Sequence, residues 1–380
     1  MGRRSSRLLL GALLLVLVLL LSFALPVRVW RTGELPAPPL PLVRGGPQVY
    51  LPERVWIDTD AACGSGRTVD PDDCLALLLL LRSPGLTVVG ISTVHGNAPL
   101  ELTDSVTRAL LNLVSSDSTP PVYRGSPVPV GEAAGRPDAP AYVALRRALD
   151  AGPLTVVALG PLTNIALALA GAPGSERNVG RLVAVMGRRP GHLFHPAEGA
   201  AGGMLFGHGP VFTDFNFAQD REAATRVLAL GLPMSLVPYE AARQVTLSPR
   251  DLGAIERASA PGAWVVERSR EWLDYWKEEI GREGFYPFDL VAAAYVVEPG
   301  LFDCAPAEAW VAEDERLWGW LDMPDALMVG LGPDPEDEVR AKGRVVYCSE
   351  PRAETHRRLL EALTSAGPRR DGRGAREPSS

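Results

Sequence analysis

The chain has 380 residues, of which 46% are hydrophobic, so it can bury a sizeable core and is too apolar for an intrinsically disordered protein. Its formal net charge is −7, and no stripe of Lys and Arg occurs outside the two ends, which argues against a nucleic acid as the partner. These properties favour a small-molecule ligand.

The first 25 residues have the pattern of an export signal. Three arginines precede an uncharged apolar run from Leu8 to about Leu25. A run of roughly 18 residues is just long enough to span a bilayer, and no clear small-residue cleavage site follows it. We therefore expect residues 1–25 to be a signal anchor or a signal peptide. Either one places the rest of the chain outside the cytoplasm, attached to the membrane if the segment is uncleaved and secreted if it is removed.

Composition divides the rest of the chain into a linker, one folded unit and a tail. Residues 26–48 are rich in Pro and Gly and predict an extended spacer. Residues 49–363 are expected to form the folded domain, and the polar segment 364–380 predicts a disordered tail.

Four cysteines fit an oxidising compartment. Pairing Cys63 with Cys74 and Cys304 with Cys348 is one of three possible connectivities, and the sequence does not choose among them. Free buried thiols are the alternative. Zinc binding is not supported, because no C-x-x-C or His partner spacing occurs.

The folded unit alternates strand-like and helix-like segments. Apolar and β-branched runs predict strands within 54–60, 86–97, 121–125, 154–160, 181–187 and 234–239. Helical patterns lie between them, within 70–85, 102–114, 142–149, 162–170 and 220–230. The alternation predicts an α/β fold with an open, mostly parallel central sheet flanked by helices.

Polar residues follow several of these strands. Asp58 and Asp60 end the first strand, His95 and Asn97 follow the second, and Met186 follows a later one. Because ligands of open parallel sheets bind at the carboxyl ends of the strands, we expect these loops to open on one edge of the sheet.

Five aspartates gather near the start of the domain: Asp58, Asp60, Asp70, Asp72 and Asp73. Carboxylates forced together repel one another unless a cation lies among them, and oxygen-only ligands favour Ca²⁺ or Mg²⁺ over zinc. The alternative from spacing alone is that some of these residues cap the following helix and the others form a solvated strand end.

This segment resembles the inosine-uridine-preferring nucleoside hydrolases, which open with a strand ending D-x-D-P-G-x-D-D-A and an apolar helix. The corresponding pieces are DTD at 58–60 and DDCLAL at 72–77. Further matches follow in family order: STVHGN at 92–97, VVALGPLTNIALAL at 156–169, DFNFAQDREAA at 214–224 and PFDLVAAAYVVEP at 287–299. The resemblance spans residues 55 to about 300. It implies a nucleoside hydrolase-like fold and Ca²⁺-dependent hydrolysis of the N-glycosidic bond of ribonucleosides, in nucleoside salvage.

The resemblance also implies roles for single residues. The Ca²⁺ ligands would be Asp60, Asp73, the backbone carbonyl of Thr163, and Asp289. Asp60 would also take a proton from the attacking water. The positions that match ribose and pocket contacts are Asp72, Asn97, Met186, Asp214 and Asn216, with Asp58 in support. The implied partner is a small-molecule ribonucleoside, and a homo-oligomer is expected because family members are often dimers or tetramers.

The sequence departs from the family pattern in three places. The segment AACGSGRTVDP at 61–71 is an insertion in which Asp70 matches nothing. Phe288 replaces the His that protonates the leaving base in purine-active members, so His95 and His208 are candidate catalytic substitutes, each with a purely structural alternative. Asp214 replaces a Glu, and Arg188 and Arg189 could favour an anionic substituent on the ribose or lie in a solvated flap.

Two other functions remain open. A nucleoside-binding or sensing protein would keep the metal and ribose site without efficient turnover, which Phe288 would explain. A phosphatase reading of the DTD motif leaves the segments at 160–169 and 214–220 without a role.

Overall fold

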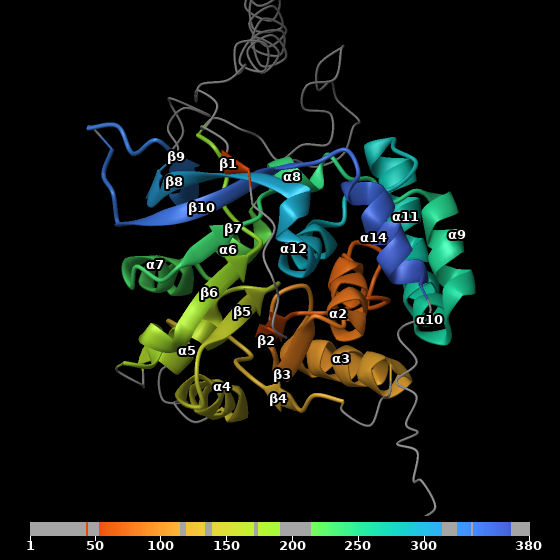
Figure 1. Ribbon diagram of the computed structural model, residues 1–380, viewed down its shortest axis with the longest axis horizontal. Coiled ribbons are helices and arrows are strands. Elements are labelled where there is room, and N and C mark those ends of the chain that lie inside the picture. Colours follow the sequence, from red (N-terminus) through yellow and green to blue (C-terminus); the bar gives the residue numbers. More distant parts are fainter. Residues whose placement is uncertain are drawn as a thin grey trace, which may run out of the picture.

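One central sheet organises the chain (Figure 1). The computed structural model describes residues 43–44, 53–114, 119–133, 139–170, 174–190, 214–313, 325–335 and 337–365. Within these residues the sheet has 10 strands in the order β1-β8-β10-β7-β6-β5-β2-β3-β4, and β9 pairs with β8.

Most neighbours in the sheet run parallel. The parallel strands are β2 (Glu53–Thr59), β3 (Leu86–Thr93), β4 (Val122–Arg124), β5 (Leu154–Ala158), β6 (Val179–Ala184), β7 (Met234–Leu236) and β10 (Ala341–Pro351). Antiparallel pairing adds β1 (Val43–Arg44), β8 (Phe302–Glu313) and β9 (Asp325–Gly330) at the other end. The predicted α/β fold with an open, mostly parallel sheet flanked by helices is confirmed.

Helices cover both faces of the sheet (Figure 1). One core forms between the sheet and α4 (Pro140–Asp150), α5 (Thr163–Ala170) and α7 (Arg221–Ala229). A second core lies on the other face, with residues from α2 (Asp72–Arg82), α3 (Leu100–Val114), α8 (Tyr239–Ala242), α9 (Pro249–Ala258), α10 (Ala260–Arg268), α11 (Arg270–Tyr275), α12 (Phe288–Val297) and α14 (Thr355–Thr364). Shorter elements are α6 (Phe215–Gln219), a π-helical turn at Trp276–Ile280, and 3₁₀ turns at Ser175–Asn178 and Pro299–Leu301.

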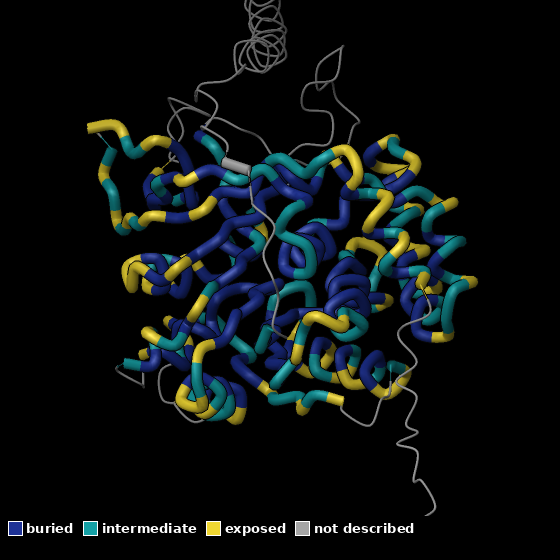
Figure 2. Tube along the Cα trace, in the orientation of Figure 1, coloured by how far each residue is buried: buried dark blue, intermediate teal, exposed yellow. Residues whose placement is uncertain are grey.

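Two helices lie almost wholly inside the protein. In α2 every residue from Asp72 to Leu80 is buried, and in α12 every residue from Asp289 to Val296 is buried. Figure 2 shows both helices mostly in the colour of buried residues. Their sequences are apolar on all sides, which is typical of a helix that is surrounded by other elements. The only charged residues in this buried part are the aspartates of their first turns.

The predicted strands and helices between residues 54 and 239 are all present, as β2 to β7 and α2 to α5 and α7. Two features were not predicted. The antiparallel strands β8 to β10 complete the sheet, and Val43–Arg44, within the expected spacer, pair with β8 at Asp303 and Cys304. The expected signal segment (1–25) lies outside the described residues, among which no helix is long and apolar enough to cross a membrane.

Both disulfides join cysteines that are local in sequence. Cys63 is bonded to Cys74, and Cys304 is bonded to Cys348. The second bond links the antiparallel neighbours β8 and β10, whereas the first closes the insertion between β2 and α2. We call residues 64–70, which this first bond encloses, the disulfide loop.

Candidate active site

A cavity of about 390 Å³ opens where the parallel strands end. Its walls come from the segments after β2, β3, β6 and β7, from α11, and from the starts of α2, α6 and α12. The lining residues are Thr68, Val69, Asp70, Asp72, Asn97, Val185, Met186, Gly187, Asp214, Phe215, Asn216, Tyr239, Trp272, Tyr275, Phe288 and Asp289. The expected edge of the sheet is therefore the edge that carries the cavity.

Three carboxylates lie close together at this cavity: Asp72 and Asp289 line it, and Asp73 lies next to them. Asp72 and Asp73 occupy the first turn of α2, and Asp289 occupies the first turn of α12. One oxygen of each lies within 4.8 Å of the others. The two helix N-termini favour negative charge at this point, and the backbone N–H of Asp289 donates a hydrogen bond of 2.7 Å to Asp72 Oδ2. The packing of α2 against α12 thus brings together carboxylates that are more than 200 positions apart in sequence.

Asp60 lies beside this group and makes different contacts. Its Oδ2 accepts a hydrogen bond of 2.7 Å from the backbone N–H of Asn97. Its Oδ1 is buried and makes no hydrogen bond with any described residue. Glycines allow this close packing, because a Cβ at Gly96 would lie 1.9 Å from Oδ2 and one at Gly160 would lie 2.9 Å from Oδ1.

Burial raises the pKa of each of these carboxyls, and for Asp60, Asp72 and Asp289 the neighbouring carboxylates add to the effect. The pKa of Asp72 rises to about 6, and those of Asp60 and Asp289 rise well above the usual range. The pKa of Asp73 is also raised by burial, although hydrogen bonds from Thr59 and Asn97 oppose the shift. No ion pair among the described residues includes these four aspartates.

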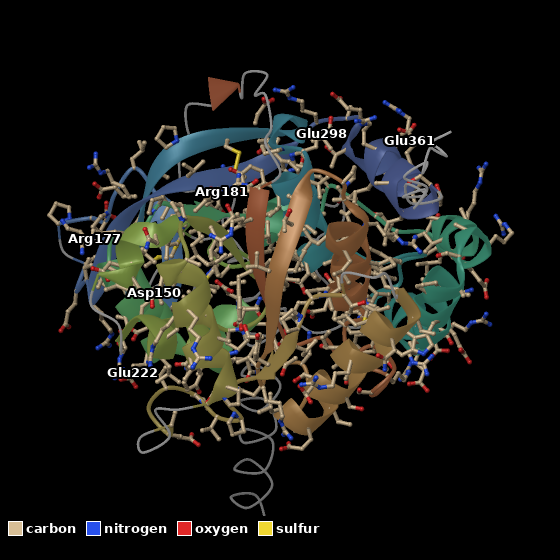
Figure 3. All side chains as sticks on the ribbon, turned by 60° about the horizontal axis from the view of Figure 1, so that its bottom comes forward. Asp150, Arg177, Arg181, Glu222, Glu298 and Glu361 are labelled. Carbon is tan, nitrogen blue, oxygen red and sulfur yellow. A yellow bond between two sulfur atoms is a disulfide. The ribbon has the colours of Figure 1, made fainter. Side chains whose placement is uncertain are left out.

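Elsewhere, charged side chains pair with one another near the surface. Glu222 pairs with Arg226, and Glu298 pairs with Arg358. Figure 3 shows Glu222 and Glu298 at the margin of the molecule. Among the described residues these four buried carboxylates have no cationic partner, and Oδ1 of Asp60 has no hydrogen bond, so together they form a donor set that fits a hard metal cation.

The polar wall of the cavity has side chains that are fixed by the backbone. The Asn216 amide group donates hydrogen bonds to the carbonyls of Leu159 (2.6 Å) and Val185 (3.1 Å). Asp214 Oδ2 accepts a hydrogen bond of 2.7 Å from the N–H of Gly187, and burial raises the pKa of Asp214 to about 6. The Asn216 amide thus ties together the segments after β5 and β6, and the Asp214 carboxylate also accepts a hydrogen bond of 3.4 Å from the N–H of Phe217, which caps α6.

Asn97 contributes to the same wall. Its Nδ2 donates a hydrogen bond of 3.0 Å to Asp73 Oδ2, and its backbone N–H holds Asp60. Met186, predicted as a pocket residue, also lines the cavity. The four predicted ribose positions, Asp72, Asn97, Asp214 and Asn216, thus line one cavity.

Asp58 and Asn164 lie behind the cavity and do not line it. Asn164 Nδ2 donates a hydrogen bond of 2.7 Å to Asp58 Oδ1, and Asn164 Oδ1 accepts one of 2.9 Å from Ser126 N–H. Burial raises the pKa of Asp58 to about 7. These contacts tie together the ends of β2, β4 and α5, which agrees with the predicted supporting role of Asp58.

The predicted metal ligands can be compared with the carboxylates that lie together. The expected set contains Asp60 and Thr163, whereas the three carboxylates within 4.8 Å of one another are Asp72, Asp73 and Asp289. Asp60 is a close neighbour of this trio, and its Oδ2 accepts the hydrogen bond from the N–H of Asn97. Thr163 is buried at the start of α5, and its hydroxyl donates a hydrogen bond of 2.6 Å to Asp220.

Aromatic side chains form a further part of the lining, the aromatic wall, and apart from Phe288 its residues were not predicted from the sequence. Trp272 and Tyr275 come from α11 and are stacked, with ring centroids 5.3 Å apart. Tyr239, at the start of α8, stacks on Phe288 at 5.9 Å. The aromatic residues in REWLDYW at 270–276 are the sequence feature that could have indicated this wall. Their position at the cavity, however, depends on tertiary packing.

The disulfide loop completes the cavity. Thr68, Val69 and Asp70 line it, so the insertion is part of the site. Asp70 Oδ1 accepts a hydrogen bond of 3.1 Å from the N–H of Asp72, which ties the end of the loop to α2. Burial raises the pKa of Asp70 well above its usual range, with Asp72 the next largest cause.

The other candidates lie elsewhere. His95 is buried outside the cavity lining, where its Nδ1 lies 3.3 Å from the carbonyl of Ser126 and burial lowers its pKa. His208 lies outside the described residues. Arg189 faces the buried Glu240, which accepts a hydrogen bond of 3.0 Å from the Arg189 backbone N–H. Neither Arg188 nor Arg189 lines the cavity, so their positions give no support to recognition of an anionic sugar substituent.

Comparisons with known proteins agree with this geometry. The family described as "Inosine-uridine preferring nucleoside hydrolase" matches residues 55–347. The non-specific ribonucleoside hydrolase RihC of Escherichia fergusonii is 29% identical over 276 residues, which cover 66% of this chain and 81% of the relative. RihC of Salmonella paratyphi B is 31% identical over 255 residues, covering 61% and 76%.

Solved structures show the same fold. A plant nucleoside hydrolase, the PpNRh1 enzyme, aligns with a TM-score of 0.63 and 22% identity, covering 83% of this chain and 100% of that one. A purine-preferring ribonucleoside hydrolase from Gardnerella vaginalis aligns with a TM-score of 0.62 and 19% identity, covering 82% and 98%.

Proposed function

The chain belongs to the inosine-uridine preferring nucleoside hydrolase family of N-glycosyl hydrolases, and we propose that it hydrolyses ribonucleosides to ribose and free base in a Ca²⁺-dependent reaction. The observation that carries the proposal is the meeting of buried carboxylates with Asn97 and Asn216 in one cavity. The names of the curated relatives, non-specific ribonucleoside hydrolases, support a ribonucleoside as the substrate.

The cation of this site is Ca²⁺ in our proposal. All available donors are oxygens, with no Cys or His among them, and such sets suit calcium better than zinc. Asp60, Asp73, Asp289 and the backbone carbonyl of Thr163 would hold the ion, and the geometry adds Asp72 as a neighbour in the same group. When bound, calcium offsets the repulsion among the carboxylates and makes a nearby water more acidic.

Asp60 is the base of the proposed reaction. Its Oδ1 accepts a proton from a water molecule as the water oxygen bonds to the anomeric carbon of the ribose. The bond from that carbon to the base nitrogen breaks, and its electron pair goes to the base. The sugar gains positive charge on the way, which the anionic floor of the cavity stabilises.

The polar wall binds the ribose hydroxyls in this proposal. Asn97 and Asn216 have amide nitrogens bound within the protein, so their oxygens are the groups that accept hydrogen bonds from the sugar. Asp72 and Asp214 add carboxylate acceptors. These contacts hold the sugar at a fixed angle to Asp60, which lowers the entropic part of the barrier.

Phe288 favours a second candidate function. It lies directly before Asp289 in the cavity lining and has no proton to give to the departing base. A protein that binds or senses nucleosides would keep the metal and ribose groups and need no such donor. The proton-accepting Asp60 counts against this candidate, because binding alone does not require a base.

We further propose that the domain works outside the cytoplasm, carried there by residues 1–25 and either secreted or anchored. The two disulfides support this location, because such bonds persist in oxidising compartments. Protease treatment of intact cells that express the protein, with and without permeabilisation, tests it. Degradation only after permeabilisation would contradict an exposed domain.

The function is tested by measuring reducing-sugar release from purine and pyrimidine ribonucleosides and their 5′-phosphates. The assay runs with calcium, with a chelator, and with an Asp60→Ala variant. We expect release from nucleosides that is lost in both controls. Binding of nucleoside and calcium without sugar release would establish the sensing function, and phosphate release from nucleotides would point to a phosphatase.

A further inference from the structure

A buried carboxylate beside the cavity has no part in the proposed chemistry. Glu240 belongs to α8, where it directly follows the cavity residue Tyr239, and it does not itself line the cavity. Glu240 is only 2% exposed. A buried carboxylate is unfavourable unless its oxygens are bound, so the contacts of Glu240 indicate what it does.

Glu240 binds the backbone of the segment that follows β6. Its Oε1 accepts a hydrogen bond of 3.0 Å from the backbone N–H of Arg189, and Nε of the Arg189 guanidinium lies 4.0 Å from the same oxygen. Hydrogen bonds to an ionised carboxylate are stronger than those to a neutral acceptor. Glu240 therefore holds one end of segment 187–189.

The middle of this segment is held by the antiparallel part of the sheet. The N–H of Arg188 donates a hydrogen bond of 3.1 Å to the carbonyl of Leu327, and the carbonyl of Arg188 accepts one of 2.8 Å from the N–H of Val329. Both partners belong to β9, so the segment is tied to this strand as well as to α8.

The start of the segment carries the contact to the cavity. The N–H of Gly187 donates its hydrogen bond of 2.7 Å to Asp214 Oδ2. Gly187 has a φ of +87°, and a Cβ at this position would lie 3.1 Å from Cγ2 of Val329, so the backbone packs closely on β9 here. The place of the Asp214 carboxylate therefore depends on where segment 187–189 lies.

Glu240 and Asp214 also influence each other through charge. Burial raises the pKa of Asp214 to about 6, and the charge of Glu240 adds to the rise, whereas that of Arg188 opposes it. Burial and the charge of Glu240 likewise raise the pKa of the Tyr347 hydroxyl on β10 well above its usual range. These side chains thus form one buried cluster beside the cavity.

Resting on the proposed function, we propose that Glu240 is a positioning residue for sugar binding: it holds segment 187–189, and through Gly187 it fixes the Asp214 carboxylate at the ribose. Glu240 does not line the cavity, so it acts through Asp214 rather than on the sugar. Its Oε1 must extend from α8 to the N–H of Arg189. An acceptor that ends one methylene short removes this tie and lets Asp214 move relative to the sugar.

Two substitutions separate the length of this side chain from its charge. Glu240→Gln keeps an acceptor oxygen at the same distance and loses the charge, whereas Glu240→Asp keeps the charge and is one methylene shorter. KM is measured for inosine and uridine in calcium. We expect KM to stay within about fivefold of the wild type for Glu240→Gln and to rise about 10- to 100-fold for Glu240→Asp. The factor should be the same for both nucleosides, since they share the ribose.

The matched control is Glu53→Asp, which shortens another carboxylate by one methylene. Glu53, at the start of β2, forms an ion pair of 3.1 Å with Arg181 and does not line the cavity, so this variant should keep the wild-type KM. A double-mutant cycle shows whether Glu240 acts through Asp214. In an Asp214→Ala background, Glu240→Asp should raise KM by no more than about a further twofold.

A second pair of variants tests the same hydrogen bond from its donor side. Arg189→Pro lacks the N–H that Glu240 binds, and Arg189→Ala keeps this N–H while it loses the guanidinium. We expect KM to rise with Arg189→Pro and not with Arg189→Ala. Thermal melting checks the folding of each variant, and this pair decides the proposal if Glu240→Asp does not fold.

Three outcomes would overturn the positioning role: an unchanged KM in Glu240→Asp, an equal rise in Glu240→Gln and Glu240→Asp, or the same rise from Glu240→Asp with and without Asp214. Failure of the proposed function is seen separately, because the wild type would then release no sugar. In that case dissociation constants of inosine and uridine from calorimetric titration replace KM. A loss of affinity in Glu240→Asp alone then supports the positioning role, and equal affinities reject it.

Discussion

The backbone N–H of Asn97 donates a hydrogen bond of 2.7 Å to Oδ2 of Asp60. This contact turns the carboxylate so that Oδ2 is occupied and Oδ1, packed against Gly160, makes no hydrogen bond with the described residues. A base works best when one oxygen is held and the other is left for the transferred proton. The fixed orientation of Asp60 is therefore the geometric reason to assign it that role.

Replacing Asp60 by Asn tests this role with little change in shape. The Asn side chain can still accept the hydrogen bond from Asn97 but cannot take up a proton from water. We expect kcat to fall about 10²- to 10⁴-fold, the range that a positioned base contributes, with the melting temperature nearly unchanged. Sugar release and thermal melting measure the two effects. Turnover within tenfold of the wild type would remove Asp60 from the reaction.

Metal removal should make stability depend strongly on pH. Burial raises the pKa of Asp72 to about 6 and that of Asp58 to about 7, from an unfolded value near 3.8. Between about pH 4 and pH 7 the folded protein without metal binds more protons than the unfolded chain, so its free energy of unfolding falls as the pH rises through this range. Calcium binds the deprotonated carboxylates, so it should raise the free energy of unfolding most strongly at the upper end of this pH range.

The measurement is the melting temperature at pH 5.5 and pH 7.5, in chelator and in calcium. In chelator the protein should melt several degrees lower at pH 7.5 than at pH 5.5, and calcium should reverse this order. Asp58→Asn is the matched variant, because it keeps an acceptor for Asn164 but removes one titrating group, so its melting temperature in chelator should vary less with pH. A chelator-treated protein that gains stability toward pH 7.5 would contradict the prediction.

The two disulfides should differ in their effect on metal binding. Cys63 lies three residues after Asp60, and Cys74 directly follows Asp73, so this bond links the two carboxylate-bearing segments. Replacing both cysteines by Ala should lower the free energy of unfolding by about 3 kcal/mol, as expected for the loss of a short closed loop, and should also weaken calcium binding.

The Cys304–Cys348 bond is the control, since it lies between β8 and β10 and closes a segment of 44 residues. Its double Ala variant should lose about 4 kcal/mol of stability by the same loop-entropy argument and leave calcium affinity unchanged. Urea unfolding and calorimetric titration with calcium give both quantities. Equal losses of calcium affinity in the two double variants would show that the first bond has no special link to the site.

Phe288→His tests whether departure of the base limits turnover. An imidazole at this point of the cavity could protonate the leaving base, a contribution worth about 10²- to 10⁴-fold when well placed. We expect kcat for inosine to rise at least about tenfold, because a newly placed acid recovers only part of that range. 4-Nitrophenyl riboside, whose leaving group needs no proton, should be little affected. Equal changes for the two substrates would assign the limiting step elsewhere.

The sequence allowed prediction of those parts of the fold and site that depend on local patterns. The strands ending at Thr59 and at Thr93 are apolar runs bounded by polar residues, so both the sheet and the edge that carries Asp60 and Asn97 could be inferred. Asp289 was found only through its motif, because its place beside Asp72 depends on the packing of α12 against α2.

The aromatic wall could not be predicted for the same reason. Trp272 and Tyr275 lie about 200 positions after Val69, on a helix whose sequence has no strand-end pattern. Only the packing of α11 beside the disulfide loop brings them into the cavity. The short parallel strands were predicted because each is a clear apolar run. The strands β8 and β10 have 12 and 11 residues, mix buried and exposed positions, and pair with each other antiparallel, so they lack such a run.

The Cys63–Cys74 bond has a further consequence for protein engineering. Because it joins Cys63 covalently to Cys74 in α2, residues 64–70 of the disulfide loop can be exchanged without separating the segment after β2 from α2. The segment 64–70 is therefore a replaceable loop beside the carboxylates, held in place by the disulfide. A library of replacement segments of varied length, screened for sugar release from different nucleosides, could therefore change substrate choice while the rest of the protein stays as it is.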